Sequence, residues 1–219
     1  MSYNSEFRIQ NSKLIAKKRE LRAFYTGLRK GLGERMREKK SADITAHILS
    51  LPAVADCDMI MAYRNIGSEV DTFDLMSGIL ASGRGLALPY CRETGGMGAA
   101  QVWNLNEDIE AGPFGTVEPK SKLKGNIDVE RIGVCICPGV AFDMYGTRLG
   151  RGRAFYDNFL SGIKGRAKLI GCAFDCQVSD HPLPKESHDA AMDLMVTESG
   201  VLTVKSIQPQ NINIFAGQD

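Results

Sequence analysis

The sequence predicts an α/β fold, a single domain with a mostly parallel central sheet flanked by helices and an N-terminal basic helical segment. Short apolar runs that suit buried strands alternate with segments of helical periodicity, which is the pattern of a parallel sheet. A leucine repeat near the start predicts an amphipathic helix. No internal repeat, low-complexity tract or linker rich in Pro, Gly or Ser divides the chain, so we expect one domain over residues 1–219.

The first fifty residues predict two helices. Leu14, Leu21, Leu28 and Leu32 recur at spacings of seven, seven and four, as the apolar stripe of a helix does. Two glycines that flank Leu32 interrupt this pattern. Ser41 then predicts the N-cap of a second helix that ends near residue 50, because a serine hydroxyl accepts hydrogen bonds from the first free N–H groups of a helix.

Beyond this segment, strands and helices are predicted to alternate. The helix at residues 71–83 is expected to be capped by Asp71 or Thr72 and to stop at Gly83. The run at residues 132–142 is long and apolar enough for the centre of the sheet. The predicted strands are residues 58–65, 86–91, 99–105, 132–142, 168–174 and 193–198, and a fourth helix is predicted at residues 152–163.

Charge and hydropathy exclude several classes of protein. The chain of 219 residues has a net charge of +1, so no global field favours nucleic acid or a membrane. Residues 13–40 hold eleven basic and three acidic residues, a local charge of +8 that the rest of the chain balances. No apolar run approaches the roughly 18 residues of a membrane span, and the polar N-terminus lacks a signal peptide's apolar core. We expect a cytoplasmic protein with no nucleic-acid, membrane or obligate protein partner.

Six cysteines allow two interpretations. Cys135 and Cys137 lie two residues apart in a predicted strand, so both are expected on one face of it. Cys172 and Cys176 flank another apolar run. Zinc ligands usually occur in polar surroundings at characteristic spacings, so we favour buried, reduced core thiols over a structural metal site.

The stretch GTRLGRGRAFYDNFL, residues 146–160, is the most specific feature of the sequence. Its glycines allow backbone N–H groups to approach a phosphate, and the helix that follows adds a favourable dipole. Its arginines offer forked cationic donors that suit phosphoryl oxygens. The spacing matches neither the P-loop nor the dinucleotide fingerprint. These residues alone favour a site for a polyanion, with a solvated turn as the alternative.

Acidic residues elsewhere suggest a metal site. The carboxylates of residues 183–198, brought near Asp157 by the fold, would suit Mg²⁺, which takes few protein carboxylates and fills its shell with water and phosphate. A charged loop and a helix cap are the simpler alternative. Glu69 follows a predicted strand and is expected either to bind a substrate amine or to cap the next helix.

Six segments in order give the chain a family resemblance. They are KKRELR (17–22), YRNIGSEVDT (63–72), PFGTVEPK (113–120), PGVAFDMYGTRLGRGRAFYDNFL (138–160), LIGCAFDCQ (169–177) and LPKESHDAAMDLMVTE (183–198). Together they resemble the 5-formyltetrahydrofolate cyclo-ligase, or methenyltetrahydrofolate synthetase, family. The resemblance implies ATP- and Mg²⁺-dependent closure of 5-formyltetrahydrofolate to 5,10-methenyltetrahydrofolate, with release of ADP and phosphate.

The resemblance also implies roles for individual residues. Asp157 and Asp189 match the magnesium positions. Glu69, Phe114, Arg151 and Phe155 are expected to contact the folate, with Phe114 packed on the pterin. The residues expected to bind ATP are Lys18, Arg19, Arg22, Arg148, Leu149, Gly150, Arg151, Gly152, Arg153, Ala154, Phe155 and Tyr156.

Two positions depart from the family pattern. Where the family usually reads Gly-Tyr-Tyr-Asp, this chain has Ala154, Phe155, Tyr156 and Asp157. Ala154 is expected to adopt a conformation outside the region that glycine favours, and Phe155 lacks a hydroxyl. Neither change removes a charge, so we expect catalysis.

Two other functions remain as alternatives. A non-catalytic relative would bind folate or nucleotide without turnover. A nucleic-acid-binding protein would use residues 13–40 and would show steep salt dependence, although the segment lacks interleaved aromatic residues.

Overall fold

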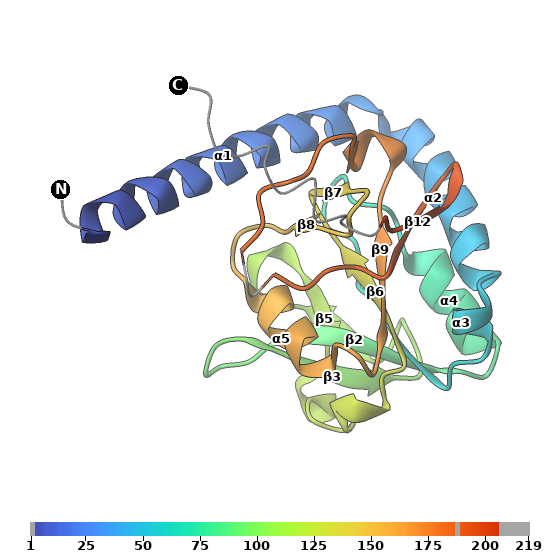
Figure 1. Ribbon diagram of the computed structural model, residues 1–219. Helices are drawn as coiled ribbons and strands as arrows, with labels where there is room; N and C mark the ends of the chain where they lie inside the picture. The colour runs from blue at the N-terminus through green and yellow to red at the C-terminus, as the bar shows by residue number, and fades with distance from the viewer. Residues whose placement is uncertain (1–2, 187–188, 206–219) are drawn as a thin grey trace.

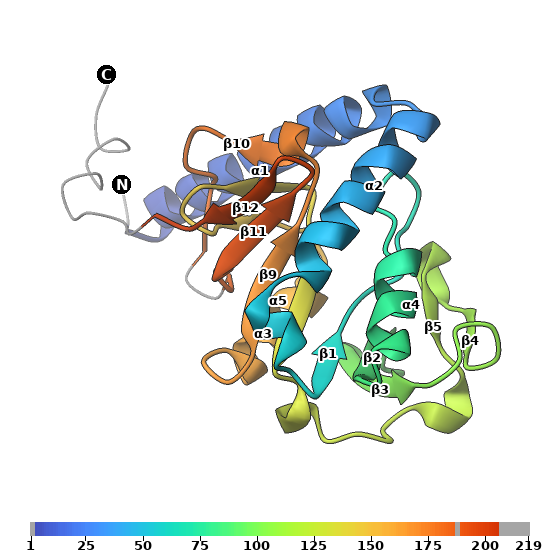
Figure 2. The same ribbon diagram turned by 90° about the vertical axis from the view of Figure 1, so that its right-hand side faces the viewer.

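A computed structural model describes residues 3–186 and 189–205. Its main sheet has seven strands in the order β12-β11-β9-β6-β1-β2-β3. The five inner strands are parallel, and each edge strand pairs antiparallel with its neighbour. Helices cover both faces of this sheet (Figures 1 and 2). The predicted fold class is therefore confirmed.

The elements have the following bounds. The α-helices are α1 (Tyr3–Gly31), α2 (Glu34–Leu49), α3 (Pro52–Ala55), α4 (Phe73–Ala81) and α5 (Phe155–Ile163). The strands of the main sheet are β1 (Met59–Met61), β2 (Gly85–Cys91), β3 (Met97–Val102), β6 (Val134–Pro138), β9 (Lys168–Cys172), β11 (Leu194–Thr197) and β12 (Gly200–Thr203). Two small sheets comprise β7 (Ala141–Asp143), β8 (Arg148–Leu149) and β10 (Val178–Ser179), and β4 (Ile109–Ala111) with β5 (Val117–Pro119). Short 3₁₀ turns occur at Pro113–Gly115, Ser121–Leu123, Val129–Arg131 and Asp175–Gln177.

The two faces of the main sheet carry separate apolar cores. Along β1, Ile60 belongs to the core shared with α2 and α4, whereas Met59 and Met61 belong to the core shared with α5. This alternation follows from the two-residue period of a strand. Figure 2 shows α2, α3 and α4 on one side of the strands and α5 on the other. The β6 residues Cys135 and Cys137 share the α5 face, as predicted.

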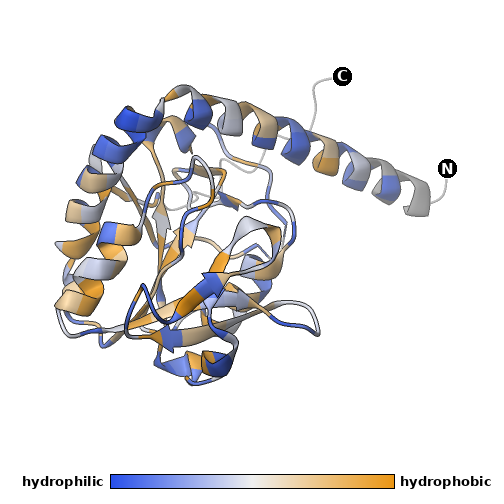
Figure 3. Ribbon diagram, turned by 180° about the vertical axis from the view of Figure 1, so that it is seen from behind, coloured by the Kyte–Doolittle hydropathy of each residue, from blue (hydrophilic) through white to orange (hydrophobic). Residues whose placement is uncertain are grey.

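Helix α1 packs on the small β10-β7-β8 sheet, and its N-terminal part extends beyond the rest of the fold (Figure 1). Leu21 and Tyr25 contact the small core that contains Leu149. The leucine stripe is only partly correct, since Leu28 is 41% exposed and a different face of the helix is buried. Much of α1 is hydrophilic, with a few hydrophobic turns (Figure 3).

Two local predictions were wrong. Helix α2 begins at Glu34, directly after Gly33, and Ser41 lies inside it. The Ser41 hydroxyl is buried and accepts the N–H of Asp71, so it ties α2 to the loop before α4 instead of capping a helix. The run at residues 132–142 forms β6 and β7 in different sheets, because the chain bends between them at Gly139 and Val140.

All six cysteines are free thiols, and Cys135, Cys137 and Cys172 are buried. Burial raises the pKa of Cys172 to about 12, so this thiol remains protonated at neutral pH. These three are core thiols, as the sequence predicted. Within the described ranges, no helix has both the length and the apolar character needed to cross a membrane.

Candidate functional site

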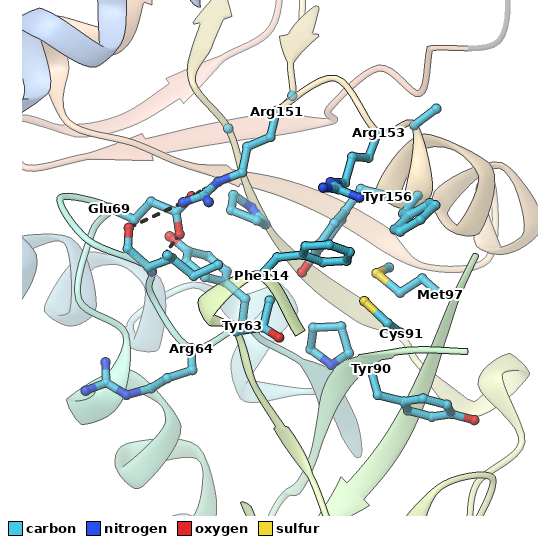
Figure 4. A pocket seen from close by; sticks show the side chains of 18 of the residues that line it. Tyr63, Arg64, Glu69, Tyr90, Cys91, Met97, Phe114, Arg151, Arg153 and Tyr156 are labelled. Carbon is cyan, nitrogen blue, oxygen red and sulfur yellow. Dashed lines mark hydrogen bonds and ion pairs between the residues drawn. The ribbon is translucent and has the colours of Figure 1, made fainter. Parts of the chain in front are cut away.

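A pocket opens at the carboxyl ends of three neighbouring parallel strands, β1, β2 and β6. Tyr63 and Arg64 follow β1, Cys91 ends β2, and Gly139 follows β6. The segment 150–157 forms the facing wall (Figure 4). Ligands bind at this end of open parallel sheets. The glycine–arginine segment therefore lies at the end of the sheet where such ligands bind.

The glycine–arginine loop, residues 146–154, turns sharply before it enters α5. Gly150 lies so close to Arg148 that a Cβ at position 150 would be 3.0 Å from Nη1. Ala154 precedes α5 with φ 55° and ψ 5°, in the left-handed region. The expectation that alanine would leave this region was wrong, because the tight entry into the helix imposes the conformation on whichever residue is present.

Arg148 and Asp157 form a buried ion pair beside the pocket. Arg148 Nη2 donates to Asp157 Oδ1 over 2.5 Å, and Nη1 donates to the carbonyl of Pro138 over 3.1 Å. The guanidinium also lies over the ring of Tyr156, 5.5 Å from its centroid. Among the described residues, the buried Arg148 Nε and the hydroxyl of Tyr156 have no hydrogen-bond partner. Burial raises the pKa of Tyr156 well above its usual value, so the hydroxyl keeps its proton.

Glu69 and Arg151 meet on another side of the pocket (Figure 4). Arg151 Nε and Nη2 lie 3.0 and 2.9 Å from Glu69 Oε1. The second carboxylate oxygen, Oε2, accepts the N–H of Ile66 over 2.9 Å. Glu69 is buried whereas the Arg151 side chain is 46% exposed, so the glutamate is fixed and the arginine borders solvent. Two residues expected to contact substrate are thus in contact with each other.

Phe114 forms an exposed aromatic wall of the pocket. Phe114 is 60% exposed, and the Arg153 guanidinium lies 3.6 Å from its ring centroid. Figure 4 shows the two side chains next to each other. Phe114 has φ 62°, a left-handed conformation that is costly for an aromatic residue. An exposed aromatic face in a strained turn is suited to stacking against a flat ligand.

The basic residues of α1 approach the loop from outside the pocket. Arg22 Nε donates to the carbonyl of Gly150 over 2.8 Å. The buried Lys18 Nζ lies 2.6 Å from Glu186 Oε2 and 3.0 Å from Asp189 Oδ2. Arg19 is exposed on α1. The structure therefore brings Arg22 and Lys18 to the predicted site by different contacts.

Other predicted residues divide between the pocket and the core. Gly150, Gly152 and Phe155 line the pocket, whereas the Leu149 side chain is buried against Tyr25. Asp157 lines the pocket, but Asp189 does not.

Within residues 3–186 and 189–205, no three acidic, histidine or cysteine side chains form a metal cluster. Asp157 and Asp189 are instead each held by a cation of the chain. Asp193 instead stabilises the main sheet, because its Oδ2 accepts the N–H of Leu169 in β9.

Two further pocket residues, and one cation beside the pocket, were missed in the sequence. Buried Glu118 lines the pocket and accepts the Cys91 N–H over 3.1 Å, although it lies inside the quoted PFGTVEPK segment. Burial raises the pKa of the pocket residue Tyr63 well above its usual value. Arg29 is buried on α1. The sequence did hold a signal for Arg29, because its spacings of seven from Arg22 and eleven from Lys18 place all three cations on one helix face.

The fold and the pocket define an α/β protein with a cationic ligand site at the carboxyl end of a parallel sheet. The sequence model described as the 5-formyltetrahydrofolate cyclo-ligase family matches residues 14–198. The chain belongs to this family.

Individual relatives cover most of both chains. A "Probable 5-formyltetrahydrofolate cyclo-ligase" of Schizosaccharomyces pombe is 27% identical over 198 residues, 85% of this chain and 97% of the relative. The Escherichia coli 5-formyltetrahydrofolate cyclo-ligase is 27% identical over 178 residues, 79% of this chain and 96% of the relative. The NMR structure of Aquifex aeolicus 5,10-methenyltetrahydrofolate synthetase is similar with a TM-score of 0.75 and 28% identity, covering 91% of this chain and 99% of that one.

Proposed function

We infer that this protein is an ATP-dependent ligase that cyclises 5-formyltetrahydrofolate to 5,10-methenyltetrahydrofolate, releasing ADP and phosphate. Family membership supports the reaction. The observation in the structure that best supports it is that two buried donors that line the pocket, Arg148 Nε and the Tyr156 hydroxyl, have no hydrogen-bond partner among the described residues. Buried donors without partners are costly, so a ligand oxygen placed between them would complete their hydrogen bonding.

The chemistry requires alignment and charge neutralisation more than a protein nucleophile. The formyl oxygen attacks the γ-phosphorus of ATP, a P–O bond forms, and the bond to the β-phosphate oxygen breaks to release ADP. The second folate nitrogen then attacks the formyl carbon and the oxygen departs as phosphate. Arg148, Arg151 and Arg153 would offset the negative charge that is carried through both steps.

The folate would occupy the side of the pocket that Glu69 and Phe114 form. Phe114 would stack on the flat pterin, and Glu69 would accept hydrogen bonds from its nitrogen donors. Phe155 and Arg151 border the same space. The contact between Arg151 and Glu69 would then be exchanged, at least partly, for contacts with substrate.

The ATP phosphates would lie against the loop and the N-terminus of α5. Lys18 and Arg22 would face them from α1, and Arg19 would add charge at the rim. Gly150 and Gly152 leave the backbone accessible. This arrangement draws on α1, the small sheet and the main sheet at once, so we propose that the chain acts as a single domain.

The donor set fits magnesium in its chemistry. Asp157 uses Oδ1 for Arg148 and lines the pocket with its side chain, and Asp189 supplies a second carboxylate. Mg²⁺ commonly takes one or two protein carboxylates together with phosphate oxygens and water. When bound, it would offset charge on the transferring phosphoryl group. Asp157 and Asp189 would hold it, and Lys18 and Arg148 would keep both carboxylates oriented.

The test is product formation by the purified protein. Incubation with ATP, Mg²⁺ and 5-formyltetrahydrofolate should produce the methenyl absorption band, with one ADP formed for each product. Substrate binding without product would instead identify a non-catalytic relative.

A cytoplasmic location remains a prediction.

A further inference from the structure

One face of α1 carries three buried or half-buried cations that reach different parts of the site. Lys18, Arg22 and Arg29 are spaced by four and seven residues, so they share a helix face. Arg22 contacts Gly150 in the segment assigned to ATP, and Lys18 contacts Asp189, which is assigned to magnesium. Arg29, eleven residues from Lys18, lies at the folate side.

Arg29 is 4% exposed, and its two hydrogen bonds lead to the pocket rim. Its Nε donates to the Ser68 hydroxyl over 3.1 Å, and its Nη1 donates to the carbonyl of Gly139 over 3.4 Å. Burial lowers the pKa of Arg29, while the negative charge of Glu69 acts in the opposite direction. Burial of a guanidinium carries a large desolvation penalty, which only specific hydrogen bonds or charge partners can offset. The partners of Arg29 therefore indicate what it does.

The Ser68 contact fixes the turn that presents Glu69. The Glu69 N–H donates to the carbonyl of Ile66 over 3.3 Å, and the Glu69 carboxylate accepts the Ile66 N–H. Gly67 adopts φ 59° within this turn, and Ser68 directly precedes the glutamate. A hydrogen bond to Ser68 therefore restrains the backbone that sets the direction of the Glu69 side chain.

The Gly139 contact holds that turn against the end of β6. The Gly139 carbonyl also accepts Nε2 of the buried Gln177 over 2.9 Å. Gly139 itself lines the pocket, and a Cβ there would be 2.5 Å from the Phe142 ring. Arg29 thus joins the turn at residues 66–69 to a tightly packed part of the sheet.

We propose that Arg29 is a positioning residue that acts through Glu69: it fixes the turn at residues 66–69 against Gly139 so that the Glu69 carboxylate faces the folate. This inference rests on the proposed function. It predicts a specific defect in folate use, because Arg29 contacts neither the glycine–arginine loop nor the segment 186–189 in any hydrogen bond described for it.

The first experiment compares Arg29→Lys and Ser68→Ala with wild type in steady-state assays and in calorimetric titrations with 5-formyltetrahydrofolate. Arg29→Lys should raise the KM and the Kd for 5-formyltetrahydrofolate about tenfold, since lysine keeps the charge but loses the fork that serves both acceptors. Ser68→Ala removes one acceptor without disturbing the buried charge and should raise both about threefold. The KM for ATP should stay within about twofold of wild type in both variants. Lys30→Ala, an exposed change on the same helix, is the matched control.

A double-mutant cycle with Glu69→Gln separates positioning from general loss of structure. If Arg29 acts through Glu69, Arg29→Lys should add less than about twofold to the folate KM once Glu69 is already glutamine. Fully additive effects of the two substitutions on the folate KM would overturn the proposal. Equal increases in the KM values for ATP and for folate in Arg29→Lys would overturn it as well. Should Arg29→Lys fail to fold, an unchanged folate KM in folded Ser68→Ala would overturn it alone. Wild-type enzyme that makes no product would reject the proposed function, and the calorimetric Kd values would still decide the role of Arg29.

Discussion

Replacement of Ala154 by glycine should stabilise the protein. Ala154 has φ 55° and ψ 5° at the residue before α5. An L-residue in this left-handed conformation brings its Cβ too close to the following carbonyl oxygen, at a cost of about 1–2 kcal/mol. Glycine avoids this cost because it has no Cβ. The change also leaves the charges of the loop untouched.

The expected size follows from two opposing terms. Relief of the left-handed strain contributes about 1–2 kcal/mol, while the extra freedom of glycine in the unfolded chain removes about 0.4–1 kcal/mol. The net gain in the free energy of unfolding is therefore about 1 kcal/mol, which corresponds to a rise in Tm of about 2–4 °C for a chain of this size.

Differential scanning calorimetry and denaturant unfolding followed by circular dichroism provide the assay. Ala46→Gly is the matched control, because Ala46 is exposed inside α2 and has no strain to relieve. That change should lower stability by about 1 kcal/mol. Opposite signs at the two positions support the strain at Ala154. A loss at Ala154 as large as that at Ala46 would refute the reasoning.

Three further predictions concern the nucleotide side, the metal and pH. Arg22→Ala should raise the KM for ATP about tenfold with the Tm nearly unchanged. The control, Lys17→Ala on the exposed side of α1, should leave the KM for ATP unaltered. Equal KM values for the two variants would show that Arg22 does not contribute to ATP binding. Asp157→Asn and Asp189→Asn should each reduce magnesium-dependent turnover on the order of a hundredfold. Turnover is measured against magnesium concentration, with circular dichroism as the folding control. Wild-type magnesium dependence in either variant would exclude that residue from the metal site. Hydrogen bonds from backbone N–H groups lower the pKa of Asp108, so its contribution to stability is present above the unfolded-state pKa of about 3.9 and is lost as pH falls through the lower folded value. The loss of unfolding free energy caused by Asp108→Asn should therefore shrink at acid pH. A loss that stays constant from pH 7 to pH 3 would contradict this.

The main sheet could be predicted because its signals are local. Apolar runs such as the one around Ile136 mark buried strands, and the helices between them require parallel pairing. The small β10-β7-β8 sheet could not be found in this way. Its strands contain two or three residues each, so they are too short for a period to appear. The same limit hid the turn at Gly139, whose requirement for glycine comes from a ring three residues away.

The helical segment shows how tertiary contacts override pattern. Leucine spacing predicted an apolar stripe on α1, but Leu28 faces solvent while Lys18 and Arg29 are buried. These cations are buried because each reaches acceptors supplied by distant loops, and such partners are invisible in the local sequence. Ser41 likewise has the residue type of an N-cap but faces a backbone N–H thirty residues away.

The candidate site was predictable to the extent that its residues are adjacent in sequence. The segment from Arg148 to Asp157 concentrates glycine, arginine and carboxylate at a helix start, and all of it except Leu149 lines the pocket. The pairing of Arg151 with Glu69 depends on the order of strands in the sheet, which composition does not reveal. The left-handed conformation of Ala154 was mispredicted because residue type alone suggested that alanine would avoid it.

Formation of the methenyl product by wild-type protein tests the central claim most directly. The purified chain is mixed with 5-formyltetrahydrofolate, ATP and Mg²⁺, and the methenyl absorption band and ADP are followed together. We predict that both appear in equal amounts and that omitting either ATP or Mg²⁺ prevents their formation. ADP without methenyl product, or substrate binding without either, would contradict the assignment of cyclo-ligase activity.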